Sequence, residues 1–295
     1  MLLKSKIIIL VLCSALFQAC GQTTTQKNKN NGTTETPLAS ETHSNPNGST
    51  IAERFHAPNG YNRIVSDSVS FTSFLRNLSL KEVGSEVNYF DGRPKANDNV
   101  YAAVVDLPIG KRDLHQCADA VMRLRADYLF KHKKYDSIHF NFTNGFTADY
   151  ATWRKGKRIV VNGNKVSWKK SAQASDSAKS FWKYLEMVFS YAGTASLEKE
   201  TESVSLENMK VGDVFIKGGF PGHAVIVVDM ANNKSNGEKV FLMAQSYMPA
   251  QEIQLLQNPN TDLISPWYKL SDISTELITP EWTFTSTQLR RFSTN

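Results

Sequence analysis

The sequence predicts an α+β domain in which helices precede an antiparallel sheet of short strands. Apolar side chains recur at helical spacing in residues 71–78, 113–128 and 177–192. The last third is rich instead in short runs of apolar and β-branched residues, such as residues 212–216 and 222–229. No internal repeat interrupts this order, and the chain is long enough to bury one sizeable core.

The first 20 residues have the layout of a secretory signal peptide. Lys4 and Lys6 precede an apolar run over residues 7–17, which is too short to span a bilayer. The run closes on Leu-Phe-Gln-Ala-Cys, which resembles the lipobox of bacterial lipoproteins and implies lipidation of Cys20. Ordinary secretion is the alternative. Gly21 supplies no acidic inner-membrane retention signal, so we expect a lipid anchor in the bacterial cell envelope, on the periplasmic side of the outer membrane.

Residues 21–50 are mainly Thr, Asn, Ser, Gly, Pro and Lys and offer almost nothing to bury, so they predict a disordered tether. A single folded domain is expected at residues 51–295. Two of the 34 Lys and Arg residues lie in the signal peptide, which leaves 32 against 28 acidic residues. This mild positive balance implies no nucleic-acid partner.

The helix predicted over residues 113–130 carries the one cysteine of the folded part, and a strand over residues 100–106 precedes it. Asp113 is the expected N-cap, with Gln116 three residues later as in a capping box. Cys117 shares one helical face with three apolar residues. These are Val121, Leu124 and Tyr128.

A basic β-hairpin is expected next, with Asn162 and Gly163 as a type I′ turn. Residues 153–170 hold seven Lys or Arg and no acid. This composition is typical of a solvated face, or of a surface that contacts an anionic envelope polymer through its cations and tryptophans. The candidate contact residues are Trp153, Arg154, Lys155, Lys157, Arg158 and Trp168. A helix over residues 177–192 follows, with Gly193 suited to its C-cap.

Several motifs are absent, which narrows the chemistry. The sequence has no GxGxxG, GxxxxGK[ST], HExxH, GxSxG or CxxC, so nucleotide-binding, serine-hydrolase and metal-finger interpretations lose their usual support. Cys13 and Cys20 lie in the signal, which leaves Cys117 without an intramolecular disulfide partner. His115 lacks a second cysteine or a paired histidine, so neither a metal nor a cofactor is predicted.

Cys117 and His223 are the candidate nucleophile and base. A helix N-terminus and a nearby imidazolium both lower the pKa of a thiol, so we expect Cys117 to be an activated thiolate. Gly222 allows a sharp turn before His223, which opens a strongly apolar strand. The alternative is a packed structural thiol beside an ordinary turn histidine.

A third polar group normally orients the imidazole of such a pair. Gln245, on the following strand, faces His223 if Val228 lies opposite Val240. A tight turn between the two strands brings Ala250 there instead. The sequence leaves this register open.

The order of these features resembles the NlpC-type cell-wall cysteine peptidases and their papain-like relatives: a helix-borne cysteine, a Gly-Asp strand, a Gly-His strand and a polar residue on the next strand. The resemblance covers residues 116–130 and 212–245, although Gln-Cys-Ala-Asp replaces the family's usual Asp-Cys-Ser-Gly. It implies a papain-like core with the cysteine helix packed on an antiparallel meander, and the basic hairpin as an insertion. It also implies cleavage of an amide in peptidoglycan peptides. Over its full length the chain more closely resembles exported bacterial lipoproteins known only as a domain of unknown function.

Two hypotheses follow. The first is an envelope-tethered cysteine hydrolase that cleaves an amide or ester: Cys117 attacks, His223 transfers protons, Gln245 orients His223, and the Cys117 N–H with the Gln116 side chain binds the oxyanion. The second is a non-catalytic lipoprotein module that binds an envelope polymer. Both predict an envelope polymer or peptidoglycan fragment as partner and membrane attachment through the N-terminal lipid.

Overall fold

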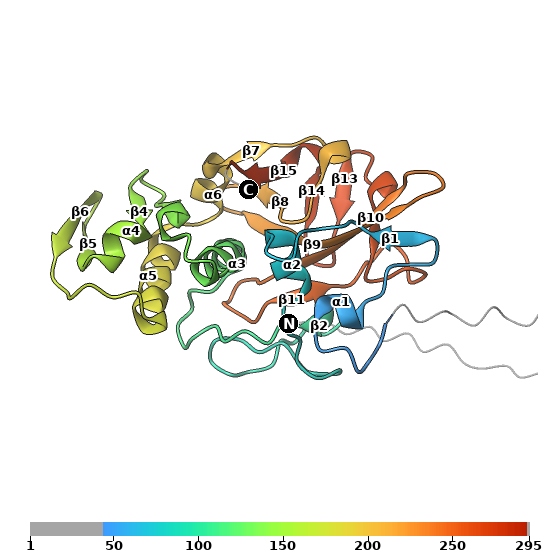
Figure 1. Cartoon of the computed structure of the whole chain (residues 1–295), viewed down its shortest axis with the longest axis horizontal. Helices are drawn as coiled ribbons and strands as arrows, with labels where there is room; N and C mark the ends of the chain where they lie inside the picture. The colour runs from blue at the N-terminus through green and yellow to red at the C-terminus, as the bar shows by residue number, and fades with distance from the viewer. Residues whose placement is uncertain (1–43, 294–295) are drawn as a thin grey trace, which may run out of the picture. The chain divides into compact units, whose positions relative to one another are not determined.

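The computed structural model describes residues 44–293, which form a mixed α+β fold around one large antiparallel sheet (Figure 1). The main strand order is β2-β11-β10-β9-β8-β15-β7, with β1 also paired to β9 and β12 to β10. The strands are β1 (Tyr61–Arg63), β2 (Tyr101–Val104), β7 (Thr201–Ser203), β8 (Val214–Lys217), β9 (His223–Asn233), β10 (Lys239–Gln245), β11 (Gln254–Leu256), β12 (Tyr268–Lys269) and β15 (Leu289–Phe292). The predicted class and the late antiparallel strands are confirmed.

Helices and small hairpins surround this sheet. The α-helices are α1 (Ile51–Arg54), α2 (Phe71–Arg76), α3 (Cys117–Lys131), α4 (Tyr150–Arg154), α5 (Ala178–Tyr191) and α6 (Thr194–Glu200). The two-stranded sheets are β3 (His139–Asn141) with β4 (Thr147–Asp149), β5 (Lys157–Asn162) with β6 (Lys165–Lys170), and β13 (Glu276–Ile278) with β14 (Thr283–Thr285). Short 3₁₀ turns occur at Tyr135–Ser137, Leu206–Asn208, Leu270–Asp272 and Ser286–Gln288. None of the helices between residues 44 and 293 has the length and apolar composition needed to cross a membrane.

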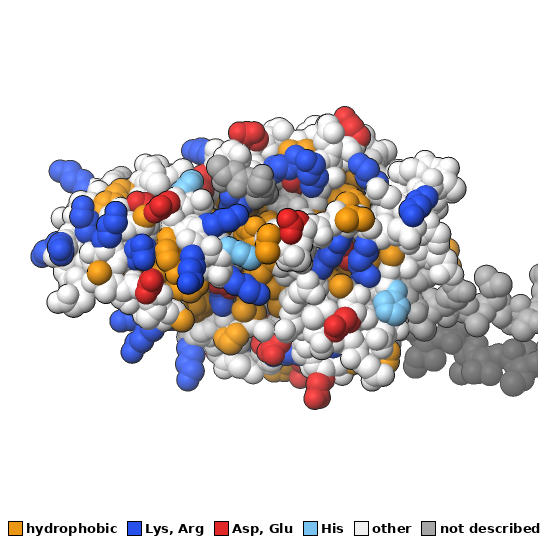
Figure 2. Space-filling view, viewed as in Figure 1, with side chains coloured by type: hydrophobic (Ala, Val, Ile, Leu, Met, Phe, Trp, Pro, Cys, Tyr) orange, Lys and Arg blue, Asp and Glu red, His pale blue; other side chains and the backbone are white. Residues whose placement is uncertain are grey.

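The predicted basic hairpin is present as β5 and β6. Figure 2 shows Lys and Arg side chains gathered over the end of the molecule where β5, β6 and α5 lie in Figure 1. The turn differs from the prediction, because Asn162 pairs with Lys165 and the two connecting residues are Gly163 and Asn164. Of these two, only Gly163 has a positive φ, whereas a type I′ turn requires it at both positions.

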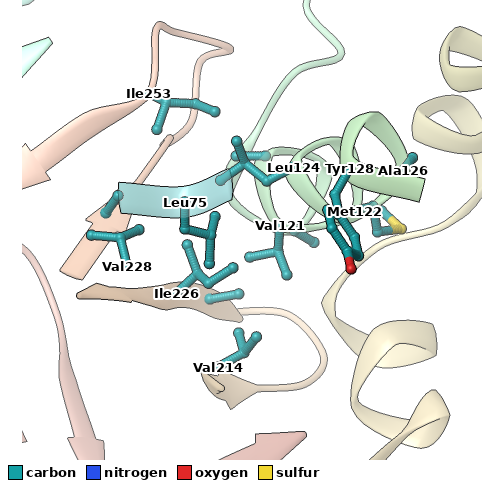
Figure 3. Packing of buried hydrophobic residues seen from close by; sticks show 14 of the residues in the cluster. Leu75, Val121, Met122, Leu124, Ala126, Tyr128, Val214, Ile226, Val228 and Ile253 are labelled. Carbon is teal, nitrogen blue, oxygen red and sulfur yellow. The ribbon is translucent and has the colours of Figure 1, made fainter. Parts of the chain in front are cut away.

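Strand β9 is buried on both faces, which explains its continuous apolar sequence. Ile226 and Val228 face the core under the helices, whereas Val225 and Val227 belong to a second core on the other face of the sheet. Figure 3 shows residues of α2 and α3 lying over the first face of β9. The labelled residues include Leu75, Val121, Leu124, Ile226 and Val228. This packing fixes the position of α3, and with it Cys117, against the sheet.

The folded part begins earlier than predicted. Residues 44–50 belong to the domain: Ser44 bridges to Phe55, Thr50 bridges to Ser79, and the Thr50 side chain accepts a hydrogen bond from the N–H of Glu53 to cap α1. The boundary at Ile51 is therefore too late, because these polar residues find backbone partners without burying apolar surface. The signal peptide, Cys20 and the rest of the predicted tether lie outside the described residues.

Two helix ends also differ from prediction. Helix α3 starts at Cys117 with Gln116 as N-cap, so the expected start at Asp113 is wrong. Gly193 was expected to cap the C-terminus of α5, but it has an extended φ of 179° and is the N-cap of α6. In both cases the hydrogen bonds of the backbone, and not the residue type alone, determine which residue caps the helix.

Candidate functional site

Cys117 is the first residue of α3, where the backbone N–H groups of the helix have no partners within it. The backbone N–H of Gln116 donates to the Asp119 carboxylate at 3.0 Å, which holds the first turn of the helix. The Gln116 side chain donates to the carboxylate of Asp113 at 3.0 Å. The sequence therefore places the thiol at a helix N-terminus, as predicted, with Asp119 rather than Gln116 closing the capping box.

His223 is the first residue of β9 and is 1% exposed. Gly222 before it permits a close approach of three chain segments. A Cβ at this position would lie 2.3 Å from the Gly219 carbonyl oxygen and 2.5 Å from the Thr194 hydroxyl. Any side chain at residue 222 would therefore push the start of β9, and with it His223, out of place.

Gln245 lies at the end of β10 and contacts the imidazole directly. The distance from His223 Nε2 to Gln245 Oε1 is 2.8 Å. The predicted partner is therefore found, although neither predicted register is: Val240 pairs with Ala231, and a β-bulge follows Leu242. After the bulge the strand register places His223 opposite Tyr247, so His223 and Gln245 are diagonal neighbours on one face.

One pocket of about 330 Å³ brings Cys117 and His223 together. The backbone N–H of Ala224, the residue directly after His223, is close enough to the Cys117 sulfur to lower the pKa of the thiol. The other walls are largely apolar or aromatic. They include Phe189, Phe220, Tyr247, Met248 and Trp282. A larger groove of about 680 Å³ between α2, α3 and α5 contains neither Cys117 nor His223, so the smaller pocket is the candidate site.

The thiol is not activated in the resting structure, contrary to the expectation of a thiolate. The pKa of Cys117 is raised to about 11, chiefly by burial and also by the nearby Asp119, although the backbone N–H groups at the start of the helix lower it. Burial also raises the pKa of Asp119 well above its usual range, and one of its carboxylate oxygens has no partner. Cys117 is therefore a neutral thiol at neutral pH.

The imidazole is neutral as well. Burial lowers the pKa of His223 to about 4, the hydrogen bond to Gln245 raises it, and the positive charge of Lys95 lowers it. Aromatic rings surround His223, with centroids at 4.7 Å for Tyr247 and 5.3 Å for Trp282. A neutral imidazole of this kind can accept a proton, which an imidazolium cannot.

Three residues at the site were not predicted from the sequence. Gln245 Nε2 donates to Glu281 at 2.7 Å, and Glu281 forms an ion pair with Lys95, also at 2.7 Å. Trp282 follows Glu281 in the turn between β13 and β14. The sequence offers one weak signal for them, the aromatic segment around Trp282, since no local pattern links residues so far apart in the chain.

The six predicted polymer-contact residues separate into two groups. The Trp153 ring is 3% exposed and donates to Ser180, so it belongs to the core and the prediction for it is wrong. Trp168 is half-buried beside Phe146 at 5.7 Å. The cationic members remain available to solvent to different degrees: Arg154, Lys155, Lys157 and Arg158.

No group of His, Cys, Asp and Glu side chains between residues 44 and 293 could hold a metal ion. His115 is fully buried, with Nδ1 3.3 Å from the carbonyl oxygen of Gln251. Burial lowers its pKa to about 3, so it is a neutral core residue. Asp229, in the middle of β9, pairs with Arg63 at 2.6 Å and does not line the pocket.

Comparison with known proteins identifies the family but no activity. No curated protein and no solved structure matches the chain. A family model described as Domain of unknown function (4846) matches residues 51–291, which is most of the chain. The match includes Cys117, His223 and Gln245. The chain therefore belongs to the family Domain of unknown function (4846).

Proposed function

We propose that this protein is a cysteine hydrolase of the bacterial cell envelope that cleaves an amide or ester bond. The single observation that carries the proposal is the shared pocket of Cys117 and His223, in which Gln245 holds the imidazole at 2.8 Å. Nucleophile, base and orienting group are the three parts of a nucleophilic catalytic device. A thiol that only filled space would need no such histidine beside it.

In the acylation step the neutral pair reacts as a unit. The Cys117 sulfur attacks the carbonyl carbon while its proton passes to His223 Nδ1, the ring nitrogen that does not contact Gln245. The carbonyl π electrons move to oxygen, which becomes an oxyanion. When the oxyanion collapses, the bond from carbon to the leaving nitrogen or oxygen breaks, and His223 returns the proton to the leaving group. The product is a thioester on Cys117.

Water completes the cycle. His223 accepts a proton from water as the water oxygen attacks the thioester, and the C–S bond then breaks with return of the proton to sulfur. The backbone N–H of Cys117 can donate to the oxyanion in both steps. The Gln116 amide can assist, because its nitrogen carries a second N–H besides the one that donates to Asp113.

The pocket favours a neutral or cationic substrate. Its lining includes the carboxylate of Asp113 but no Lys or Arg. The likeness to the NlpC-type peptidases supports a papain-like core. Together with the charge of the pocket, it supports peptidoglycan peptides as the substrate. The N-terminal signal and Cys20 support lipid attachment at the outer membrane, facing the periplasm.

The test compares Cys117→Ala, His223→Ala and the double variant on purified envelope fragments, with products followed by mass spectrometry. If the pair is one device, each single variant loses most turnover and the double variant loses little more. His139→Ala, which removes an exposed histidine, is the matched control and keeps full activity. Equal product release by wild type and Cys117→Ala would refute the proposal.

The second candidate is the non-catalytic module that binds an envelope polymer. The raised pKa of Cys117 favours it, because an unreactive thiol suits a binding protein. The exposed lysines of β5 and β6, together with Lys155 just before β5, would contact an anionic polymer. Removal of Lys155 and Lys157 should then weaken sedimentation with envelope polymer, whereas unchanged binding would remove the support for this candidate.

A further inference from the structure

A buried chain of polar side chains extends from His223 away from the pocket. Gln245 Oε1 lies 2.8 Å from His223 Nε2, and Gln245 Nε2 lies 2.7 Å from Glu281 Oε2. The same Glu281 oxygen lies 2.7 Å from Lys95 Nζ. The side chain of Lys95 is 3% exposed and that of Glu281 is 16% exposed. These residues come from three segments that are distant in the sequence.

The charges in this chain determine how the Gln245 amide is oriented. Lys95 only donates hydrogen bonds, and an ionised Glu281 only accepts them. The amide of Gln245 must therefore direct its NH₂ group to Glu281, which leaves Oε1 for His223. Amide oxygen only accepts, so His223 Nε2 must carry the ring proton. Nδ1 is then the unprotonated nitrogen of the neutral ring.

We propose that Glu281 and Lys95 are positioning residues, which fix the tautomer of His223 through Gln245 so that Nδ1 is free to accept a proton. This inference rests on the proposed function for its catalytic meaning, because Nδ1 is the nitrogen assigned there to the thiol proton. The tautomer itself depends only on the hydrogen bonds. A neutral group in place of Glu281 would allow the Gln245 amide to flip, so that its NH₂ group donates to His223 Nε2. The ring proton of His223 would then move to Nδ1.

Further contacts hold the ion pair in place. Lys95 Nζ also donates to Gln251 Oε1 at 3.0 Å, and it lies 5.5 Å from the centroid of the Tyr247 ring. Tyr247 in turn contacts the His223 ring. A buried ion pair contributes little net stability compared with well-packed apolar groups, so stability alone does not explain an ion pair at this place. The need to orient the Gln245 amide explains it.

The experiment reads the tautomer by NMR of the full folded domain labelled with ¹⁵N-histidine. The ring nitrogens of His223 are identified by their loss in His223→Gln. In wild type at neutral pH we expect the pattern of the Nε2–H tautomer alone. In Glu281→Gln we expect a second pattern, from the Nδ1–H tautomer. Glu252→Gln is the matched control, because it also removes a glutamate from a lysine ion pair, with Lys81 at 2.6 Å, and should leave the His223 pattern unchanged.

Acylation of Cys117 by a small activated ester such as p-nitrophenyl acetate is measured on the same samples. Equal population of the two amide orientations would roughly halve the rate in Glu281→Gln, and a less ordered ring would lower it further. Since Glu281→Gln leaves the Lys95 charge unpaired, Lys95→Met/Glu281→Gln is the second variant, which carries no buried charge and should give the same mixture of tautomers.

The outcomes are distinct. A pure Nε2–H pattern in the folded double variant overturns the inference. A mixture of tautomers with slower acylation supports it. A mixture of tautomers in a protein whose wild type is not acylated supports the inference about Glu281 and Lys95 while it contradicts the proposed function.

Discussion

Iodoacetamide should alkylate native Cys117 more slowly than an ordinary thiol at neutral pH, with a rate that keeps rising to high pH. The reason is the place of the thiol in the fold. Partial burial and the neighbouring Asp119 raise its pKa to about 11, from an ordinary value of 9.0. The helix N-terminus acts in the opposite direction and is outweighed.

The magnitude follows from the difference of about 2 between these pKa values. At neutral pH the thiolate fraction is about a hundredfold smaller than for the ordinary thiol. Each thiolate is intrinsically more nucleophilic, by roughly six- to tenfold for a Brønsted slope of about 0.4–0.5. The net effect of ionisation is therefore a rate lowered by about tenfold to twentyfold.

The assay follows carbamidomethylation of Cys117 by peptide mass spectrometry as a function of pH. The same cysteine in the urea-unfolded protein is the standard, and the pH dependence separates ionisation from restricted access, which scales the rate equally at every pH. A neutral resting thiol would be excluded if the native protein were alkylated faster than the standard, at a rate independent of pH from weakly acidic to neutral conditions. Such a result would mean that Cys117 and His223 form a thiolate–imidazolium pair at rest.

Two further perturbations have defined outcomes. Folding lowers the pKa of buried His115 from 6.5 to about 3, so between these pH values the unfolded state binds more protons, and the stability that His115 contributes above about pH 6.5 is lost as the pH falls toward 3. In urea unfolding, His115→Phe should remove on the order of 5 kcal/mol from this acid-induced fall in the free energy of unfolding. The same pH dependence in His115→Phe and wild type would contradict this expectation. Thr50→Ala removes the cap of α1 and should lower the free energy of unfolding by about 1 kcal/mol, whereas no change would return residues 44–50 to the tether.

The two residues proposed as nucleophile and base could be selected from the sequence because each has a local signal. Cys117 opens an amphipathic helix, and His223 follows Gly222 at the start of an apolar strand. The expected helix start at Asp113 was wrong because that carboxylate accepts hydrogen bonds from Gln116 and from the backbone of Ala250, instead of capping a helix.

The environment of these residues could not be predicted in the same way. The β-bulge after Leu242 shifts the register of β10 against β9 by one residue, which cannot be predicted from the alternation of apolar and polar residues. Gln245 still contacts His223. Lys95 and Glu281 are 186 positions apart, and only the tertiary fold brings them together. The raised thiol pKa has the same origin, since burial of Cys117 depends on segments packed around the helix rather than on the helix itself.

The most direct test of the central claim is whether His223 enables acylation of Cys117. Wild type and His223→Gln are mixed with p-nitrophenyl acetate at neutral pH, and the acyl group is located by intact-protein and peptide mass spectrometry. We expect one thioester on Cys117 in wild type, formed at least about a hundredfold more slowly in His223→Gln, because a neutral thiol needs a general base. Equal acylation of Cys117 in both proteins, or none in either, would contradict it.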